Sequence, residues 1–192
     1  MRPVEAAICP MCERQAIDGV THPGCQTRFS LDRLICLYRY DGSVKSAIKR
    51  LKYKPFLSDL AEILVEKGES GKGEGLRDFI VVPVPLHPQR ERERGFNQAS
   101  LLGKALATKL HLQFRDHVLK RTRYTKSQVE LKGDERRKNL TDAFILDTKY
   151  KIPDTNILLV DDVWTTGSTL RTCANVLKRG GAKAVWAMTV AR

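Results

Sequence analysis

Two adjacent carboxylates and a run of hydroxyl residues are the part of this sequence best suited to chemistry. Asp161 and Asp162 follow four apolar residues, 157–160, and precede a small polar loop of Thr165, Thr166, Gly167, Ser168 and Thr169. Hydroxyls and backbone N–H groups at the start of a helix can bind a phosphate, and a glycine allows close approach. Carboxylates would repel that phosphate, but they suit ribose hydroxyls or a magnesium ion, which takes oxygen ligands.

A strand and a helix must hold this stretch in place. Residues 157–160 are apolar enough for a strand buried on both faces, and Leu170, Ala174 and Leu177 have helical spacing. Ligands of open parallel sheets bind just outside the carboxyl ends of the strands. The order strand, acids, polar loop, helix predicts a site there. An ordinary strand followed by a capped helix is the alternative, and it explains neither the paired acids nor the hydroxyl run.

The same stretch, LLVDDVWTTGSTL, resembles the phosphoribosyl pyrophosphate (PRPP) signature of type I phosphoribosyltransferases. By that resemblance, Asp161 and Asp162 hold the ribose hydroxyls, and residues 165–169 wrap the 5′-phosphate. The resemblance also implies that Mg²⁺ is bound together with PRPP.

Metal-ligating residues gather near the N-terminus. Cys9, Cys12, His22 and Cys25 have the spacing C-x2-C-x9-H-x2-C. Two short-spaced pairs can supply the four tetrahedral ligands of a structural zinc site, and a segment of some thirty residues needs such support. A thiol–disulfide role for Cys9 and Cys12 is the alternative. Cys36 lies in an apolar run and remains a possible substitute for His22.

A second polar stretch follows the apolar residues 79–82. Prolines at 83, 85 and 88 indicate a rigid exit from a strand, and the next residues form a predicted loop rich in arginine. Arg90, Arg92 and Arg94 of this loop could bind pyrophosphate or a nucleic-acid backbone, with Arg94 the candidate for PRPP. The alternative is an exposed ladder of arginine and glutamate paired with itself. A helix through Ala99 and Leu110 is predicted to follow.

The charge of the chain favours a polyanionic partner. The net charge is +12, and the pI is about 9.7. Basic residues concentrate in 117–146 and on a predicted helix over 44–51, capped by Ser43, that is followed by aromatic residues. A solvated helix face is the alternative for the helix, and a plain exposed linker is the alternative for residues 117–146. No run of about 18 apolar residues or signal-peptide pattern occurs, so a cytoplasmic protein without membrane insertion is expected.

Several motifs together resemble the ComF family of phosphoribosyltransferase-like proteins. They are VPVPLHPQRERERGFNQA, the loop at 165–169, Tyr40-Asp41-Gly42, Leu51-Lys52-Tyr53 and the series Arg121, Thr122, Thr125, Gln128, Arg136, Asn139. The resemblance implies an N-terminal zinc-binding segment, a role in DNA uptake during natural transformation, contact with single-stranded DNA and protein partners in the competence machinery. Many relatives have a second C-x-x-C where this chain has His22 and Cys25, so the role of His22 rests on spacing.

The expected architecture is an α/β fold: a type I phosphoribosyltransferase-like parallel sheet flanked by helices. Residues 1–32 form a predicted zinc-binding knuckle and residues 33–192 the predicted phosphoribosyltransferase-like domain. The leading function is binding of PRPP, Mg²⁺ and single-stranded DNA. An active salvage phosphoribosyltransferase acting on a free base is the competing hypothesis, with Trp164 the only loop aromatic available to its acceptor. A DNA-binding module with a vestigial PRPP site is a third. Turnover, the acceptor and the oligomeric state stay open.

Overall fold

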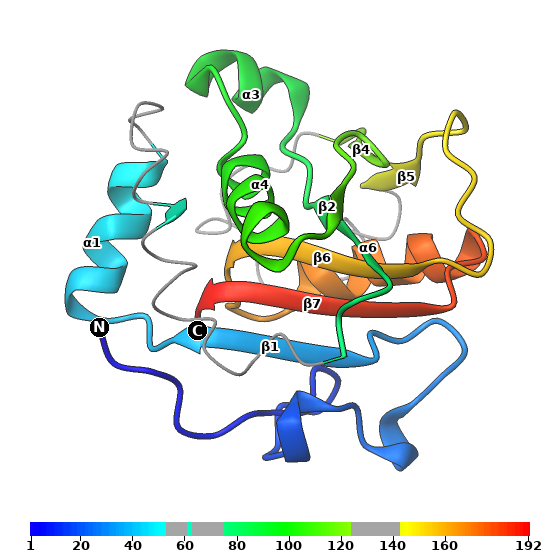
Figure 1. The fold of residues 1–192 in the computed structure, drawn as a ribbon, viewed down its shortest axis with the longest axis horizontal. Helices are drawn as coiled ribbons and strands as arrows, with labels where there is room; N and C mark the ends of the chain where they lie inside the picture. The colour runs from blue at the N-terminus through cyan, green and yellow to red at the C-terminus, as the bar shows by residue number, and fades with distance from the viewer. Residues whose placement is uncertain (53–60, 63–74, 124–142) are drawn as a thin grey trace.

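A parallel sheet forms the centre of the molecule (Figure 1). The computed structural model describes residues 1–52, 61–62, 75–123 and 143–192. Within them, five strands pair in the order β1 (Arg33–Tyr38), β7 (Ala184–Ala191), β6 (Asn156–Val163), β2 (Phe79–Pro83) and β3 (Gln113–Phe114). Every neighbouring pair in this sheet is parallel. The predicted α/β fold with a parallel sheet flanked by helices is confirmed.

The sheet is buried on both faces, as its nearly continuous apolar strands predict. Alternate residues of β6 enter opposite cores, because successive side chains of a strand point to opposite faces: Leu158 and Val160 lie in one core, Ile157 and Leu159 in the other. Helices α1 (Gly42–Leu51) and α4 (Gln98–Leu110) cover the first face. The second face is covered by α6 (Ser168–Arg179), by the hairpin of β4 (Leu119–Arg121) and β5 (Phe144–Leu146), and by the N-terminal segment, residues 1–32.

The connections of the sheet diverge between β2 and β6. From β2 the chain passes through α4 to β3, while from β6 it passes through α6 to β7 on the other side (Figure 1). A point where the strand order reverses leaves a crevice at the carboxyl ends of the two strands. The loop at residues 165–169 and the segment after β2 therefore meet at the edge where ligands of such sheets bind.

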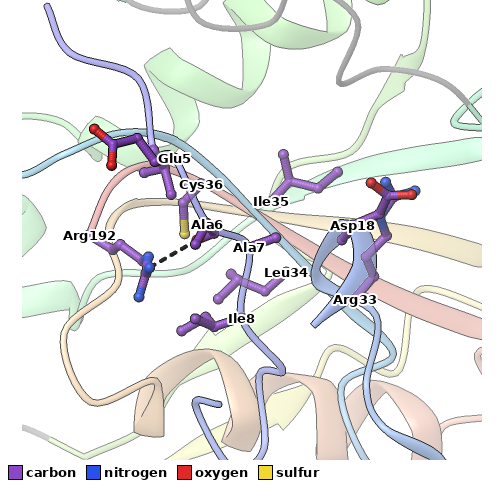
Figure 2. A pocket seen from close by; sticks show the side chains of 11 residues that line it. Glu5, Ala6, Ala7, Ile8, Asp18, Arg33, Leu34, Ile35, Cys36 and Arg192 are labelled. Atoms are coloured by element: carbon purple, nitrogen blue, oxygen red, sulfur yellow. Dashed lines mark hydrogen bonds between the residues drawn. The ribbon is translucent and has the colours of Figure 1, made fainter. Parts of the chain in front are cut away.

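The N-terminal segment lies along β1. Ile8 and Leu31 are buried against the sheet, and single bridges join Pro3 to Tyr38 and Val20 to Arg33. A cavity of about 190 Å³ lies between the segment and β1, where the Arg192 guanidinium donates a hydrogen bond to the Ala6 carbonyl at 2.9 Å (Figure 2). The segment is thus packed onto the sheet, and its division from the rest at residue 32 stays a prediction.

Some local predictions are wrong. The arginine-rich stretch predicted as a loop is helix α3 (Pro88–Arg94). Pro88 occupies its first turn, the His87 Nδ1 accepts a hydrogen bond from the Gln89 N–H at 3.2 Å, and Gly95 at φ +82° ends it. A proline that ends a strand can also begin a helix, because its missing N–H is not needed there.

Two boundaries also differ from the predictions. Asp41, not Ser43, is the N-cap residue of α1. The alternation of residues 33–40 predicts one strand over that whole range, but β1 ends at Tyr38, two residues earlier. The sequence also predicts a helix over residues 57–67 and a glycine-rich loop over 68–75, and these, like the basic stretch 124–142, lie wholly or mostly outside the described residues. None of the described helices has the length and apolar character needed to span a bilayer.

Candidate functional site

The two acids belong to the central strand itself. The prediction that they follow the strand is wrong, because β6 continues through Asp161 and Asp162 to Val163, with Asp161 paired in register with Thr189 of β7. The alternation of the strand sends the two side chains toward different faces of the sheet. Their surroundings therefore differ although they are adjacent in sequence.

Asp162 is neutralised from the α1 side. Its side chain is buried, with 6% of the residue exposed, and its Oδ2 lies 2.6 Å from the Nζ of Lys52. Lys52 is the C-cap residue of α1, so the end of this helix is tied to the end of β6. A buried carboxylate needs such a partner, because transfer of an unpaired charge from water is costly.

Asp161 faces the side covered by α6 and is only half-buried. Its Oδ1 accepts a hydrogen bond from the Asp162 N–H at 2.8 Å. Burial, followed by the negative charge of Asp162, raises the pKa of Asp161 well above its usual range. The ionised form would be favoured by a cation or by hydroxyl donors placed at this carboxylate.

Two arginines add positive charge near Asp161. Burial and the charge of Arg90 lower the pKa of Arg121, whereas the nearby Asp161 favours its charged form. Arg121 belongs to β4 and its guanidinium lies 5.3 Å from the ring centroid of Phe144. Arg90 belongs to α3, so that helix does approach this region.

The loop at residues 165–169, called the phosphate loop below, is built around a left-handed glycine. Gly167 is the N-cap residue of α6 with φ +66°, and a Cβ placed there would lie 2.1 Å from the Trp164 ring. Only glycine fits that conformation and that contact without strain. The Thr166 and Ser168 hydroxyls lie 3.0 Å apart, and the first N–H groups of a helix have no partner within it. The loop thus gathers donors at the carboxyl end of β6.

The buried ring of Trp164 packs against Gly167 of the phosphate loop. The residue is 4% exposed, with Gly167 against its ring and the Arg171 guanidinium 5.2 Å from its ring centroid. The hypothesis that Trp164 contacts an acceptor base is therefore wrong, because its face is covered by protein.

Arg94 lies at the end of α3, where its Nη1 donates a hydrogen bond to the Gln98 Oε1. Asn97 between them is buried: its Oδ1 accepts from the Ala99 N–H and its Nδ2 donates to the Val84 carbonyl, both at 3.0 Å. This motif fixes α3 and α4 to the segment after β2. Among the described residues, Arg94 bonds to Gln98 and not to the phosphate loop, so its role toward PRPP stays a prediction.

The four predicted metal ligands come together in the N-terminal segment. Their ligand atoms all lie within 4.8 Å of one another. The His22 Nδ1 lies 3.4 Å from the Cys12 Sγ, and its Nε2 lies 3.0 Å from the Gln15 carbonyl oxygen. Metal-bound histidines commonly direct their second nitrogen to such a carbonyl. Cys9, Cys12, His22 and Cys25, called the cysteine cluster below, could hold a metal ion, and three sulfurs with one imidazole suit zinc.

Cys36 lies outside the cysteine cluster. It belongs to β1, and its Sγ accepts a hydrogen bond from the Thr189 hydroxyl at 3.3 Å. The structure thus brings His22, and not Cys36, to the other three predicted ligands.

Comparison with known proteins places this geometry in a family. Residues 97–192 match the family model of the phosphoribosyl transferase domain. "Competence protein F" of Haemophilus influenzae is 38% identical over 169 residues, which cover 85% of this chain and 74% of that protein. "Competence protein ComFC" of Bacillus subtilis is 32% identical, with coverages of 100% and 80%. The chain belongs to the ComF family. "DNA utilization protein YhgH" of Escherichia coli K12 is a further relative of this ComF-family chain, 34% identical with coverages of 94% and 82%.

The electrostatics of the cysteine cluster in this ComF-family protein suit a cation. Burial raises the pKa of Cys9, but hydrogen bonds from the backbone of Cys12, His22 and Met11 outweigh it and lower the pKa to about 7. A hydrogen bond with Cys12, then burial and the charges of Cys12 and Cys9, raises the pKa of Cys25 to about 11. Thiolates so close repel one another unless a metal ion neutralises them.

Sequence reasoning missed three residues of these sites. Lys52 neutralises Asp162, Arg121 lies near Asp161, and Arg171 contacts both the phosphate loop and the N-terminal segment. The first two stand within motifs that resemble ComF proteins, which was a usable signal. Arg171 is one of many basic residues on exposed-looking helices, and only the fold reveals its contacts.

Proposed function

We propose that this ComF-family protein binds PRPP with Mg²⁺ at the carboxyl end of β6, contacts single-stranded DNA, and acts in DNA uptake or processing. Asp161 and Asp162 orient the ribose, and Thr165, Thr166, Gly167, Ser168 and Thr169 bind the 5′-phosphate. Arg94 acts on the pyrophosphate side. A structural zinc ion is held by Cys9, Cys12, His22 and Cys25.

The observation that carries the PRPP proposal is the position of the Gly167 turn. It opens α6 at the divergence point between β2 and β6, directly after the two acids and within the matched phosphoribosyl transferase domain. Backbone donors at that point favour an anion. Magnesium bound with PRPP would supply positive charge and take oxygen ligands. That positive charge would stabilise the ionised form of Asp161 in particular, because Asp161 is half-buried beside a second carboxylate that opposes its ionisation.

Calorimetric titration with PRPP tests this site. The parent protein should bind PRPP only weakly without Mg²⁺ and tightly with it. The double variant Asp161→Asn, Asp162→Asn should lose about 100-fold in affinity, which corresponds to about 2.7 kcal/mol. Asp154→Asn is the matched control, since Asp154 is an exposed carboxylate before the amino end of β6. Equal binding by the parent and the double variant would show that the assignment is wrong.

Helix α1 supports the DNA part of the proposal. Lys45, Lys49 and Arg50 are exposed on it, and Lys52 at its end contacts Asp162. A basic helix face thus continues into the proposed PRPP site. The net charge of +12 favours a polyanion, and the name of the Escherichia coli relative refers to DNA utilization.

Fluorescence anisotropy with a labelled oligo-dT tests this surface. The triple variant Lys45→Glu, Lys49→Glu, Arg50→Glu should weaken binding and reduce the slope of log affinity against log salt by about 2. Lys151→Glu, Arg179→Glu, Lys183→Glu changes the net charge equally at exposed residues beyond the amino ends of β6 and β7. A control triple that weakens binding as much would indicate a general charge effect and rule out an α1 interface.

Phosphoribosyl transfer is the second candidate function, favoured by the match to the transferase domain. The burial of Trp164 removes the only loop aromatic proposed for an acceptor. Incubation with PRPP and free bases, with detection of released pyrophosphate, separates the two functions. Pyrophosphate release that depends on a base and on Asp161 would establish an enzyme.

A further inference from the structure

Arg171 lies between the cysteine cluster and the phosphate loop, and all three nitrogens of its guanidinium are engaged. Nε donates to the Pro10 carbonyl, Nη2 to the Glu13 carboxylate at 2.8 Å, and Nη1 to the Thr166 carbonyl at 2.9 Å. The planar guanidinium presents its donors in a fixed fork, so the positions of its acceptors are coupled. One side chain on α6 therefore fixes two segments more than 150 positions apart in sequence.

On one side, the acceptors of Arg171 belong to the turn that carries Cys9 and Cys12 of the cysteine cluster. Pro10 stands between Cys9 and Cys12, and Glu13 directly follows Cys12. The turn that carries them is closed by hydrogen bonds from the Glu13 N–H to the Cys9 carbonyl at 2.9 Å and from the Cys9 N–H to the Arg14 carbonyl at 2.8 Å. A metal ion bound by both cysteines would stabilise this turn and hold the two acceptors in place.

On the other side, Arg171 orients the phosphate loop. Because a trans peptide group is planar, holding the Thr166 carbonyl toward Arg171 directs the Gly167 N–H the opposite way. The Gly167 carbonyl accepts a hydrogen bond from the Arg171 N–H at 2.9 Å, and the guanidinium lies on the Trp164 ring beneath the glycine. The backbone donor at Gly167 is thereby turned away from α6 and toward the outside of the loop, where the 5′-phosphate is proposed to bind.

We infer that Arg171 is a positioning residue that couples metal binding at the cysteine cluster to phosphate binding at the phosphate loop. Zinc at the cluster raises the affinity for PRPP, and by thermodynamic linkage PRPP raises the affinity for zinc by the same factor. The part of this inference that concerns PRPP rests on the proposed function. The mechanical part, cluster to loop, rests only on the contacts of Arg171.

The first experiment measures PRPP affinity by calorimetry with zinc-loaded and zinc-stripped protein. Zinc removal from the parent should weaken PRPP binding about tenfold. Arg171→Gln should show that loss with zinc still bound, and should lose little more when zinc is removed. Arg171→Lys keeps the charge but has one nitrogen for three acceptors, so its PRPP affinity with zinc bound should lie between those of the parent and Arg171→Gln. An intermediate affinity would show that the loss in Arg171→Gln is not simply a folding defect.

Arg179→Gln is the matched control. Arg179 lies on the same helix and its guanidinium is 4.7 Å from the ring centroid of Phe29 in the N-terminal segment, but its Nε donates a hydrogen bond to the Asn175 Oδ1 on α6 itself. This variant should keep the full effect of zinc on PRPP affinity. Parent protein that binds PRPP equally with and without zinc, or Arg171→Gln protein with the same zinc effect as the parent, would overturn the coupling to PRPP.

A second measurement separates this inference from the proposed function. In Trp186→Phe protein, Trp164 is the remaining tryptophan. Removal of zinc by a chelator should change its emission, and the change should disappear when Arg171→Gln is added. If no form binds PRPP but Trp164 still responds through Arg171, the proposed ligand is wrong and the mechanical coupling stands. An emission unaffected by zinc would overturn the coupling itself.

Discussion

The cysteine cluster and the phosphate loop are held by different physical means. The phosphate loop is anchored at both ends by the core, since β6 before it and α6 after it contribute the fully buried Leu158, Leu159 and Leu177. In the cysteine cluster only Cys9 is fully buried, while Cys12 is exposed and the other two ligands are half-buried. The conformation of the loop is therefore fixed by folding of the sheet, whereas the conformation of the cluster depends on the metal ion that its four residues could hold.

Substitutions in the two regions should therefore have different effects. Loss of a cluster ligand should release the N-terminal turns and leave the sheet folded. A substitution in the loop should strain the core itself, because Gly167 and Trp164 are in contact with each other and with α6. Arg171 connects the two regions, so local effects in one are expected to reach the other only through it.

The largest expected effect is the loss of metal on Cys12→Ser. Cys12 is exposed, so the change removes no core packing, but three ligands bind zinc far less tightly than four. Zinc affinity should fall by at least about 100-fold, since even residues behind the ligands contribute about 10- to 100-fold. Metal analysis of purified protein should give about one zinc in the parent and none in the variant. Full retention of zinc would show that the four residues are not the ligand set.

Gly167→Ala should be the most damaging single change in the phosphate loop. The left-handed backbone alone costs an alanine about 1–2 kcal/mol, and the Cβ would meet the Trp164 ring. A loss of about 2–4 kcal/mol in the free energy of unfolding is expected, with a loss of PRPP affinity. Urea denaturation of the parent and of Gly167→Ala protein measures this difference in the free energy of unfolding.

Gly95→Ala is the control for that experiment. Gly95 also has a positive φ, +82°, but a Cβ there meets nothing within 4 Å. Its cost should be limited to about 1–2 kcal/mol. Equal losses for the two variants would contradict the tight contact between Gly167 and Trp164.

Asp162→Asn should destabilise the protein. It leaves the Lys52 ammonium without its carboxylate partner beside a buried site. A loss of about 1–3 kcal/mol is expected, and it should be smaller in Lys52→Met, Asp162→Asn protein because no unpaired charge remains. Chemical denaturation of the single and double variants measures the coupling. A double variant less stable than the single would contradict the importance of the ion pair.

In the absence of ligand, Asp161→Asn should stabilise the protein, whereas Asp162→Asn destabilises it. The pKa of Asp161 is raised in the folded protein, so the stability contributed by its protonated form is full below the unfolded pKa of about 4 and is lost as pH rises through the raised value. The parent should therefore lose stability relative to Asp161→Asn as pH rises from 4 to 7, by about 1 kcal/mol. Thermal denaturation across this range tests the sign. A variant that is less stable than the parent at pH 7 would show that burial does not oppose ionisation here.

Much of this fold was predictable because its signals are local. Residues 157–160 form a buried strand and Gly167 precedes a helix, so apolar runs and a glycine placed the centre of the sheet correctly. The predicted end of β6 was wrong, because nothing in the sequence distinguishes an acid at the end of a strand from one just after it. Helix α3 was wrongly predicted as a loop for a similar reason, since Pro88 is compatible with both a loop and a first helical turn.

The contacts that define the site are mostly non-local and could not be predicted. Lys52 and Asp162 are separated by 110 positions, and Arg171 and Glu13 by 158. Composition shows only that basic residues are abundant, so Arg171 could not be selected among 34 lysines and arginines. The motif around Lys52 marks that residue without identifying its partner. The four cluster residues were predictable because each pair has its own short spacing, but spacing alone left Cys36 as an alternative to His22.

Cys36→Ser should have the smallest effect of these variants, and it tests whether His22 or Cys36 is the fourth ligand. Cys36 lies on β1 with its sulfur toward Thr189, away from the cluster, so zinc content should stay at about one per chain. A hydroxyl can replace the thiol as acceptor for the Thr189 hydroxyl, so the free energy of unfolding should change by less than about 1 kcal/mol. Cys25→Ser, measured beside it, should lose the metal. Loss of zinc in Cys36→Ser protein, with retention in His22→Ala protein, would mean that the strand cysteine is the fourth ligand and that the N-terminal segment rearranges around the ion.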